Sequence, residues 1–192
     1  MQEDTSNGYE AIAEAFMKAR SDAGLEVVSS WTMRLPKGSS IIDVGAGHGL
    51  PVTQALVDAG LDVYAIEPAP TLFSALRHAL PGICAACEPA ETSTFFDRQF
   101  DAVISIGLIF LLEEKRQAQF LKRLADALKP GGRLLFSAPH QKGTWNDLLT
   151  GRPSFALGRA AYKRLLSGLS LTQVAEHTDK GGSNYFEALK VN

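Results

Sequence analysis

The chain has 192 residues, a length that fits a single domain with one sizeable hydrophobic core. With 45% hydrophobic residues and a formal net charge of −2, its composition gives no argument for a nucleic-acid or anionic-membrane partner. No apolar stretch is long enough to span a bilayer, and the start, residues 1–4, is unlike a secretory signal peptide. We therefore expect a cytoplasmic monomer or homodimer that acts on a small molecule, without nucleic acid or membrane.

Two helices are expected before the first strand. Apolar residues at positions 9, 12, 13, 16 and 17 recur at helical spacing and predict a helix over residues 7–22. A second helix is expected over Leu25–Met33, and the stretch 35–39 (Leu-Pro-Lys-Gly-Ser) then predicts a turn.

The run 41–49 (Ile-Ile-Asp-Val-Gly-Ala-Gly-His-Gly) is the most informative segment. An apolar strand ends beside Asp43, and glycines follow at alternate positions, which lets the backbone approach a ligand closely. A helix is expected to open near Leu50-Pro51, and its N-terminus favours an anionic ligand group. The spacing GxGxG differs from the GxGxxG of dinucleotide-binding enzymes and favours S-adenosylmethionine over NAD.

Leu61–Ile66 is expected to be the second parallel strand, with Glu67 at its carboxyl end. A carboxylate at that position, following a glycine loop, can accept hydrogen bonds from the vicinal hydroxyls of a ribose. The sequence therefore predicts a nucleotide-type site between these two strand ends.

The remaining pattern alternates strands and helices, then changes. Helices are expected over 51–59, 71–80 and 113–128, and strands over 83–85, 100–106 and 133–138. Such alternation predicts a parallel sheet covered on both faces. Residues 145–150 and 154–167 are expected to be helical, and strands 170–177 and 185–190 are close enough in sequence to pair antiparallel.

Four segments in order resemble the motifs of class I S-adenosylmethionine-dependent methyltransferases: residues 41–49, 64–69, 100–104 and 128–136. The resemblance implies a doubly wound, Rossmann-like α/β fold with a mostly parallel seven-stranded sheet of order 3-2-1-4-5-7-6 and a C-terminal antiparallel hairpin. It also implies one domain, 1–192, made of an N-terminal helical cap (1–35), a cofactor-binding core (36–138), and a substrate-side insert with the terminal hairpin (139–192).

The same resemblance implies residues for S-adenosylmethionine and its product S-adenosylhomocysteine. Glu67 would hold the ribose, and Tyr9 and Arg20 of the helical cap would contact the methionine carboxylate. At the adenine the chain departs from the family pattern, because Pro89 stands at the usual acid position; Glu88 or Glu91 would substitute there, beside the backbone of Ala90. The expected cofactor-binding set is completed by Asp43, Gly45, Ala46, Gly47, Gly49, Pro68 and Ser105.

The acceptor is expected at the carboxyl ends of the strands. His140 follows the fifth strand and is the candidate general base, because imidazole titrates near neutrality; a surface histidine is the equal alternative. Between His140 and Leu166, five basic residues stand against one acid, Asp147, which suggests a basic, aromatic cap over a small anionic or aromatic acceptor. A solvated helix face is the equal alternative. The expected acceptor-binding set is Phe16, Gly107, Phe110, Trp145, Arg152 and Tyr162.

Two other functions remain open at this stage. A nicotinamide-dependent oxidoreductase shares the strand, glycine loop and acid, but the chain lacks GxGxxG. A non-catalytic S-adenosylmethionine-binding module is also possible, since methyl transfer requires no obligatory nucleophile in the protein. The pair Cys84 and Cys87 has no second ligand pair, so we expect no metal site.

Overall fold

The computed structural model describes residues 4–191, apart from the side chains of residues 173 and 174. The elements in chain order are η1 (Glu10–Ile12), α1 (Ala13–Ala19), α2 (Leu25–Thr32), β1 (Ser40–Val44), α3 (Val52–Asp58), β2 (Asp62–Ile66), α4 (Pro70–Ala79), β3 (Cys84–Ala86), η2 (Phe95–Asp97), β4 (Phe100–Ser105), η3 (Ile109–Leu111), α5 (Glu114–Asp126), β5 (Leu128–Ser137), β6 (Gly143–Asn146), β7 (Pro153–Ala156), α6 (Arg159–Gly168), β8 (Leu171–Thr178) and β9 (Asn184–Lys190).

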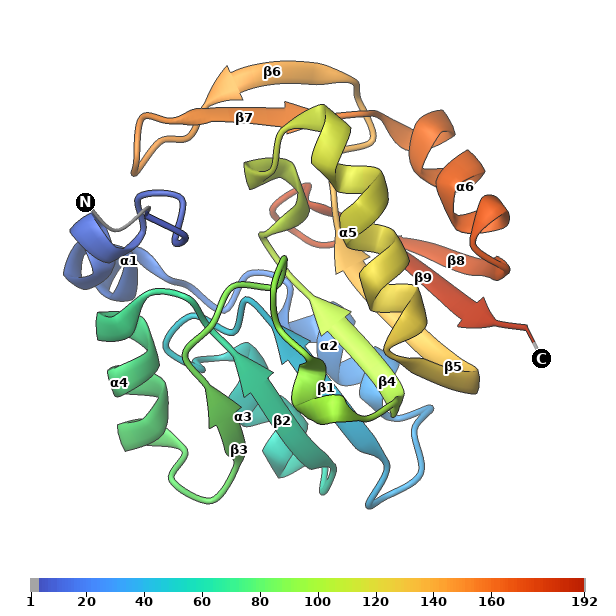
Figure 1. Ribbon diagram of the computed structural model, residues 1–192, viewed down its shortest axis with the longest axis horizontal. Helices are drawn as coiled ribbons and strands as arrows, with labels where there is room; N and C mark the ends of the chain where they lie inside the picture. Colours follow the sequence, from blue (N-terminus) through green and yellow to red (C-terminus); the bar gives the residue numbers. More distant parts are fainter. Residues whose placement is uncertain (1–3, 192) are drawn as a thin grey trace.

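Seven strands form one sheet in the order β3-β2-β1-β4-β5-β9-β8. The first five strands pair in parallel, whereas β9 runs antiparallel to both β5 and β8. This confirms the predicted order, with β8 and β9 as the sixth and seventh strands. β1 lies between β2 and β4, so its carboxyl end lies at the point where the strand order reverses (Figure 1).

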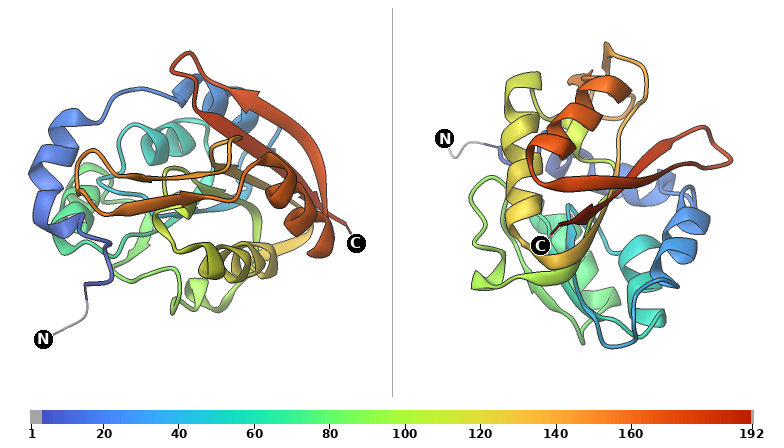
Figure 2. Two further views of the ribbon diagram at one scale, coloured as in Figure 1. Left: turned by 90° about the horizontal axis from the view of Figure 1, so that it is seen from above. Right: turned by 90° about the vertical axis from the view of Figure 1, so that its right-hand side faces the viewer.

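Helices cover both faces of the sheet, as Figure 2 shows. On one face, α2 and α3 pack through Val28, Trp31 and Leu56 against Ile41 and other side chains of the strands. On the opposite face, α5 and α6 contribute Phe120, Leu124 and Tyr162, which are packed with Phe136 and Phe186. Strand residues therefore alternate between two apolar layers, which explains why β1 is buried along its whole length.

The N-terminal helix is shorter than expected. A 3-10 turn, η1, precedes a seven-residue helix, α1, and the two are separated by a non-helical backbone conformation at Ile12. Ala13 is its only buried residue, and Tyr9, Phe16 and Met17 pack beside Ala13 against α4. The apolar stripe is therefore real, but it covers only a small part of the core.

The prediction of a helix over 145–150 is wrong. Residues 143–146 form β6, which pairs antiparallel with β7, and the turn between the strands contains Asp147. The Asp147 side chain accepts hydrogen bonds from the backbone N–H groups of Leu149 (3.1 Å) and Thr150 (2.8 Å), a turn that competes with helix formation. The second predicted helix, 154–167, begins late, at Arg159, because residues 153–156 belong to β7 and Gly158 has a φ of +84°.

The β6–β7 hairpin lies on the same side of the molecule as the N-terminal segment, and the tip of the hairpin points toward that segment (Figures 1 and 2). Two side-chain contacts join them: the Tyr9 hydroxyl donates to Asp147 Oδ2 (3.2 Å), and Arg152 pairs with Asp4 (2.7 Å). Residues from opposite parts of the chain thus meet above the carboxyl ends of the strands.

Candidate active site

The glycine loop after β1 is held tightly against the end of β2. The backbone N–H groups of Gly45 and Ala46 both donate to the carbonyl oxygen of Ile66, at 3.0 and 3.1 Å. Gly47 has a φ of +60°, and a Cβ atom there would lie 3.2 Å from the ring of Phe16. Only glycine meets both conditions without strain, so the loop leaves its backbone open to a ligand.

Glu67 connects the glycine loop with the start of α4. Its Oε2 accepts the N–H of Gly47 (2.8 Å), and its Oε1 accepts the N–H of Ala69 (2.9 Å). Burial raises the pKa of Glu67 to about 7, although these two hydrogen bonds act in the opposite direction. The carboxylate is therefore positioned by the backbone, and burial moves its pKa into the neutral range.

Asp43 is the second buried carboxylate of the site. It is 2% exposed, and its Oδ2 accepts a hydrogen bond from the hydroxyl of Thr53 (2.7 Å) in α3. Burial raises its pKa to about 6, and the Thr53 hydrogen bond and the charge of Arg20 oppose that rise. Asp43 thus couples the end of β1 to the helix that follows the loop.

Two neighbouring cavities, of about 220 and 440 Å³, open at this end of the sheet. The first contains the glycine loop, Asp43, Glu67 and residues of the N-terminal segment, whereas the second lies beyond Pro68 and includes Glu88, Ala90 and Glu91. The two share the lining residues Ser6, Gly45, Pro68, Leu108 and Leu111. The two cavities are therefore direct neighbours, separated by side chains that line both.

The N-terminal segment adds Tyr9, Phe16 and Arg20 to the first cavity. Within residues 4–191, the Arg20 side chain makes no hydrogen bond and no ion pair, while its backbone N–H donates to the carbonyl oxygen of Phe16 (2.9 Å). An unpaired guanidinium facing a cavity is suited to a carboxylate or phosphate group of a ligand. The expected positions of Tyr9, Arg20 and Phe16 around one cavity are therefore observed, while their roles stay predictions.

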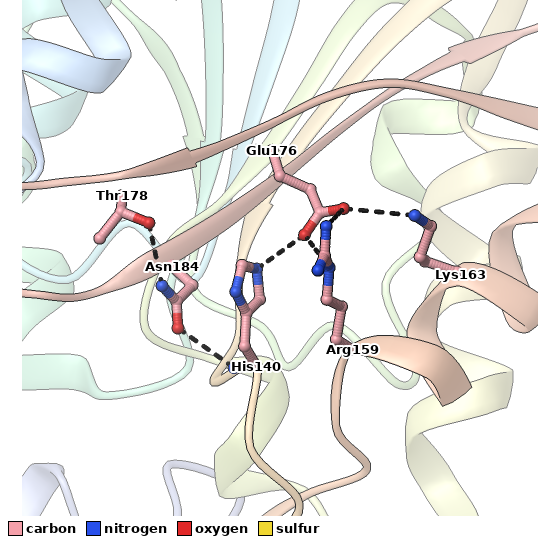
Figure 3. A network of polar contacts seen from close by, with 6 residues as sticks. All are labelled: His140, Arg159, Lys163, Glu176, Thr178 and Asn184. Atoms are coloured by element: carbon pink, nitrogen blue, oxygen red, sulfur yellow. Dashed lines mark hydrogen bonds and ion pairs between the residues drawn. The ribbon is translucent and has the colours of Figure 1, made fainter.

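His140 is not brought to either cavity. Its ring lies edge-on to Phe186, and its Nε2 is 3.0 Å from Glu176, which also pairs with Arg159 and Lys163 (Figure 3). Its backbone N–H is bonded to the side chain of Asn184. These contacts give His140 a role in joining the start of the insert to the terminal hairpin, and the geometry offers no support for a general base there.

Five further expected site residues also lie outside the linings of the two cavities: Gly49, Ser105, Trp145, Arg152 and Tyr162. Ser105 is buried and donates to the carbonyl of Val44, and Tyr162 is fully buried with its hydroxyl bonded to Gln117. Arg152 pairs with Asp4 rather than facing the cavity. Gly107 and Phe110 do line the first cavity, and the ring of Trp145 packs against Phe110 with the two centroids 5.7 Å apart.

The expected basic cap is not formed. Of the residues described, none of the five basic side chains of the insert lines a cavity; these are Lys142, Arg152, Arg159, Lys163 and Arg164. Arg159 and Lys163 pair with Glu176, and Lys142 and Arg164 are exposed. The one acid of the segment, Asp147, does line the cavity.

Sequence reasoning missed two cavity residues that carry chemistry. His48 lines the first cavity, packs edge-on against Phe16 with centroids 5.9 Å apart, and has a buried Nδ1 without a hydrogen-bond partner. Burial and the charge of Arg20 lower the pKa of His48 below its ordinary value. Asp147 was visible only as the single acid in a basic segment, a signal that did not indicate which side chains face the cavity.

Comparisons with known proteins agree with this architecture. Residues 42–136 match the methyltransferase domain family. An uncharacterized methyltransferase of Mycobacterium bovis is 37% identical over 94 residues, which cover 49% of this chain and 37% of that protein. A demethylmenaquinone methyltransferase of Renibacterium salmoninarum is 35% identical over 106 residues, covering 53% of this chain and 43% of that protein.

Among solved structures, the 1,6-didemethyltoxoflavin-N1-methyltransferase of Burkholderia thailandensis has the same fold. It superposes with a TM-score of 0.75 at 19% identity, over 97% of this chain and 91% of that one. The chain therefore belongs to the class I S-adenosylmethionine-dependent methyltransferase family, as the motifs indicated. It spans well under half the length of the curated relatives it matches. Within residues 4–191, none of the helices has the length and apolar character needed to cross a bilayer.

Proposed function

We propose that this protein binds S-adenosylmethionine and transfers its methyl group to a small molecule with an aromatic or apolar body. The observation that carries the proposal is the first cavity, where a glycine loop, the buried Glu67 and the unpaired Arg20 converge beside a group of aromatic side chains. The antiparallel β8–β9 pair and the family match favour this activity over a nicotinamide-dependent oxidoreductase.

The residues present fit the cofactor. Gly45 and Gly47 form a cradle that Cβ atoms would fill, since each would lie within 3.2 Å of a neighbouring side chain. Arg20 offers a charge for the methionine carboxylate, with the Tyr9 hydroxyl nearby, and Glu67 offers oxygens for the ribose hydroxyls. We assign the adenine to the second cavity, where Ile66 and Phe120 supply apolar surface and Glu88, Glu91 and the backbone of Ala90 supply polar groups.

Once bound, the cofactor supplies an electrophilic methyl group, and the chain positions the nucleophile and excludes water. Gly107 stands at the end of β4 with a φ of +80°, and no other atom lies within 4 Å of where its Cβ would be. Its N–H donates to the hydroxyl of Ser137 at 2.7 Å, which holds the strand end in place. The open space at Gly107, in the cavity that Phe16, Leu50 and Phe110 also line, is the position we propose for the acceptor.

The character of this space supports an aromatic acceptor rather than an anionic one. Tyr9, Phe16 and Phe110 line it, and such rings stack on other rings. The anionic acceptor expected from the sequence depended on the basic residues of the insert, and those side chains pair elsewhere or point to solvent.

Two measurements test the proposal. Titration calorimetry should show binding of S-adenosylmethionine and S-adenosylhomocysteine but not of NAD. A methyl-release assay over a panel of small aromatic metabolites should then reveal turnover. Binding of NAD alone would overturn the cofactor assignment, whereas cofactor binding without turnover on any acceptor would favour the non-catalytic module.

A further inference from the structure

The acid Asp147 occupies the position where the sequence led us to expect positive charge. It lies in the turn between β6 and β7 and lines the same cavity as the glycine loop. The other charged groups of this cavity are Arg20, Asp43 and Glu67, all on the side that we assign to the cofactor. Among the described residues, Asp147 is therefore the one charged side chain of this cavity lining that we do not assign to the cofactor.

Asp147 is held in a fixed orientation by its own turn. Oδ1 accepts hydrogen bonds from the N–H groups of Leu149 (3.1 Å) and Thr150 (2.8 Å) and from the hydroxyl of Thr150 (3.0 Å). The backbone N–H of Asp147 donates to the carbonyl of Arg152 (2.8 Å), and its carbonyl accepts the N–H of Gly151 (2.9 Å). An aspartate fixed in this way keeps its carboxylate in place when a ligand arrives.

The charge of Asp147 is retained at neutral pH. Partial burial would raise its pKa, but the hydrogen bonds from Thr150, Leu149 and Tyr9 outweigh burial and lower the pKa below the ordinary value. Tyr9 is a neutral donor, because its own burial and the charge of Asp147 raise the pKa of its phenol. Tyr9 therefore donates one hydrogen bond to Oδ2, at 3.2 Å, and carries no charge of its own.

Oδ2 has capacity for a second donor. A carboxylate oxygen accepts two hydrogen bonds, and Tyr9 is the sole donor to Oδ2 within the part of the chain that the structure describes. The surroundings are aromatic, with Tyr9, Phe16, His48 and Phe110 on the cavity lining. An ionised carboxylate among aromatic rings suits an amine, because both the carboxylate and the ring faces attract a cation or an N–H group.

We propose that Asp147, oriented by its turn and by Tyr9, selects an acceptor that presents an amino or other N–H group on an aromatic or apolar body. This inference rests on the proposed methyltransferase function and names the chemical class of its acceptor. The carboxylate acts as a hydrogen-bond acceptor that binds and orients the nitrogen-bearing end. It equally disfavours acceptors that carry a carboxylate.

Three probes with one ring and different charges test this selection: benzylamine, benzyl alcohol and benzoate. Their dissociation constants are measured by ligand-observed NMR on protein saturated with S-adenosylhomocysteine, so that Arg20 is already occupied by the carboxylate of that ligand. We expect benzylamine to bind at least about tenfold more tightly than benzoate, with the alcohol between them. Equal binding of the amine and benzoate, or tighter binding of benzoate, would overturn the inference without any variant.

The substitution Asp147→Asn keeps the oxygen that accepts the turn hydrogen bonds and removes the charge. It should bring benzylamine and benzoate to within about twofold of each other. Asp179→Asn is a matched control, because Asp179 also accepts a tyrosine hydroxyl (Tyr185, 2.8 Å) and a backbone N–H (Ser183, 2.9 Å) but lines neither cavity. The control should keep the preference for the amine.

The result also separates this inference from the proposed function. Wild-type protein that binds S-adenosylhomocysteine but shows no preference for the amine overturns the inference alone, as does a preference that persists in Asp147→Asn. Wild-type protein that does not bind S-adenosylhomocysteine overturns the proposed function, and the titration that precedes the NMR experiment detects this.

Discussion

Two hydrogen bonds at the first cavity differ in how far apart their partners lie in the sequence. Gly47 and Glu67 are separated by 20 positions, whereas Tyr9 and Asp147 are separated by 138. The side of the cleft that we assign to the cofactor is made largely from the ends of two adjacent strands, and its contact between Gly47 and Glu67 uses a backbone N–H. The side that we assign to the acceptor includes Tyr9 of the N-terminal segment and Asp147 of the β6–β7 hairpin, and the contact between them joins one side chain to another. The first arrangement follows from local sequence, while the second depends on how distant segments pack.

This difference has a consequence for substitutions. A backbone contact inside a buried loop is disturbed mainly by steric change, and the whole loop then changes. A contact between side chains on two surface segments is removed one pair at a time, and exposed pairs such as Asp4–Arg152 contribute little individually. We therefore expect the largest effects from the glycine loop, followed by the unpaired charge of Arg20, and the smallest from closure of the N-terminal segment as a whole.

The largest effect is expected from Gly47→Val. The φ of +60° is unfavourable for a branched residue, and its side chain would meet the ring of Phe16, which lies 3.2 Å from the Cβ position. Binding of S-adenosylhomocysteine should become undetectable by calorimetry. Gly38→Val is the control, since Gly38 has a φ of +78° and no neighbour within 4 Å, so it should lose stability but keep binding. Normal binding by folded Gly47→Val protein would contradict the assignment of the loop.

Arg20→Met is expected to have the next largest effect. Loss of the guanidinium should weaken S-adenosylhomocysteine binding by about 10- to 100-fold, the range for a hydrogen bond to a charged group. Adenosine, which has no carboxylate, should bind both proteins equally. Lys18→Met, in α1 and exposed, serves as the control. An equal loss for adenosine and S-adenosylhomocysteine would place Arg20 outside the carboxylate subsite.

A pH dependence of about tenfold is expected from Glu67. Ribose hydroxyls donate to the ionised carboxylate, so ligand binding favours loss of the proton from a group whose pKa burial has raised to about 7. Affinity for S-adenosylhomocysteine should therefore fall as the pH is lowered from 8 to 6, by about tenfold. Calorimetry across this range measures the slope, and the pKa of Asp43, about 6, adds a further loss only at the acidic end.

Two variants of Glu67 sharpen that measurement. Glu67→Gln should flatten the pH profile between pH 6 and 8, because the titrating group is gone. Glu67→Ala should weaken binding at pH 8 by about 1–3 kcal/mol, the usual range for losing a charged hydrogen-bond partner. A wild-type affinity that does not change over this range would show that Glu67 does not contact the ligand in its ionised form.

The smallest effect is expected in the N-terminal segment, which we propose closes over the bound cofactor. It contributes one buried residue, Ala13, to the core, and Tyr9, Phe16 and Arg20 face the cavity. Hydrogen exchange of amides 9–20 should slow by about tenfold when S-adenosylhomocysteine is added, whereas amides 25–32 of α2 should not change. Deletion of residues 1–20 should reduce activity more than thermal stability. Identical exchange with and without ligand would make the segment a fixed scaffold.

The sequence by itself determined the sheet and the cofactor side of the cleft. Apolar strands alternating with amphipathic helices leave few topologies, and the order found here is the one expected. The glycine spacing and Glu67 also follow from local pattern, because a strand end, a tight loop and the next strand end are neighbours in any such sheet. These features required no knowledge of distant contacts.

The tertiary structure alone decided the acceptor side. The composition of residues 141–165 predicted a basic cap. In the structure, Arg159 and Lys163 form ion pairs with Glu176, and Arg152 forms one with Asp4. The acid of this segment, Asp147, is the charged residue that lines the cavity. His140 follows the fifth strand as expected, but packing on Phe186 and pairing with Glu176 direct its ring elsewhere. Residue counts fix how much charge a segment carries. Ion pairs between distant residues and the geometry of turns decide which of those charges face a ligand. Neither can be predicted from the hydrophobic periodicity of the sequence.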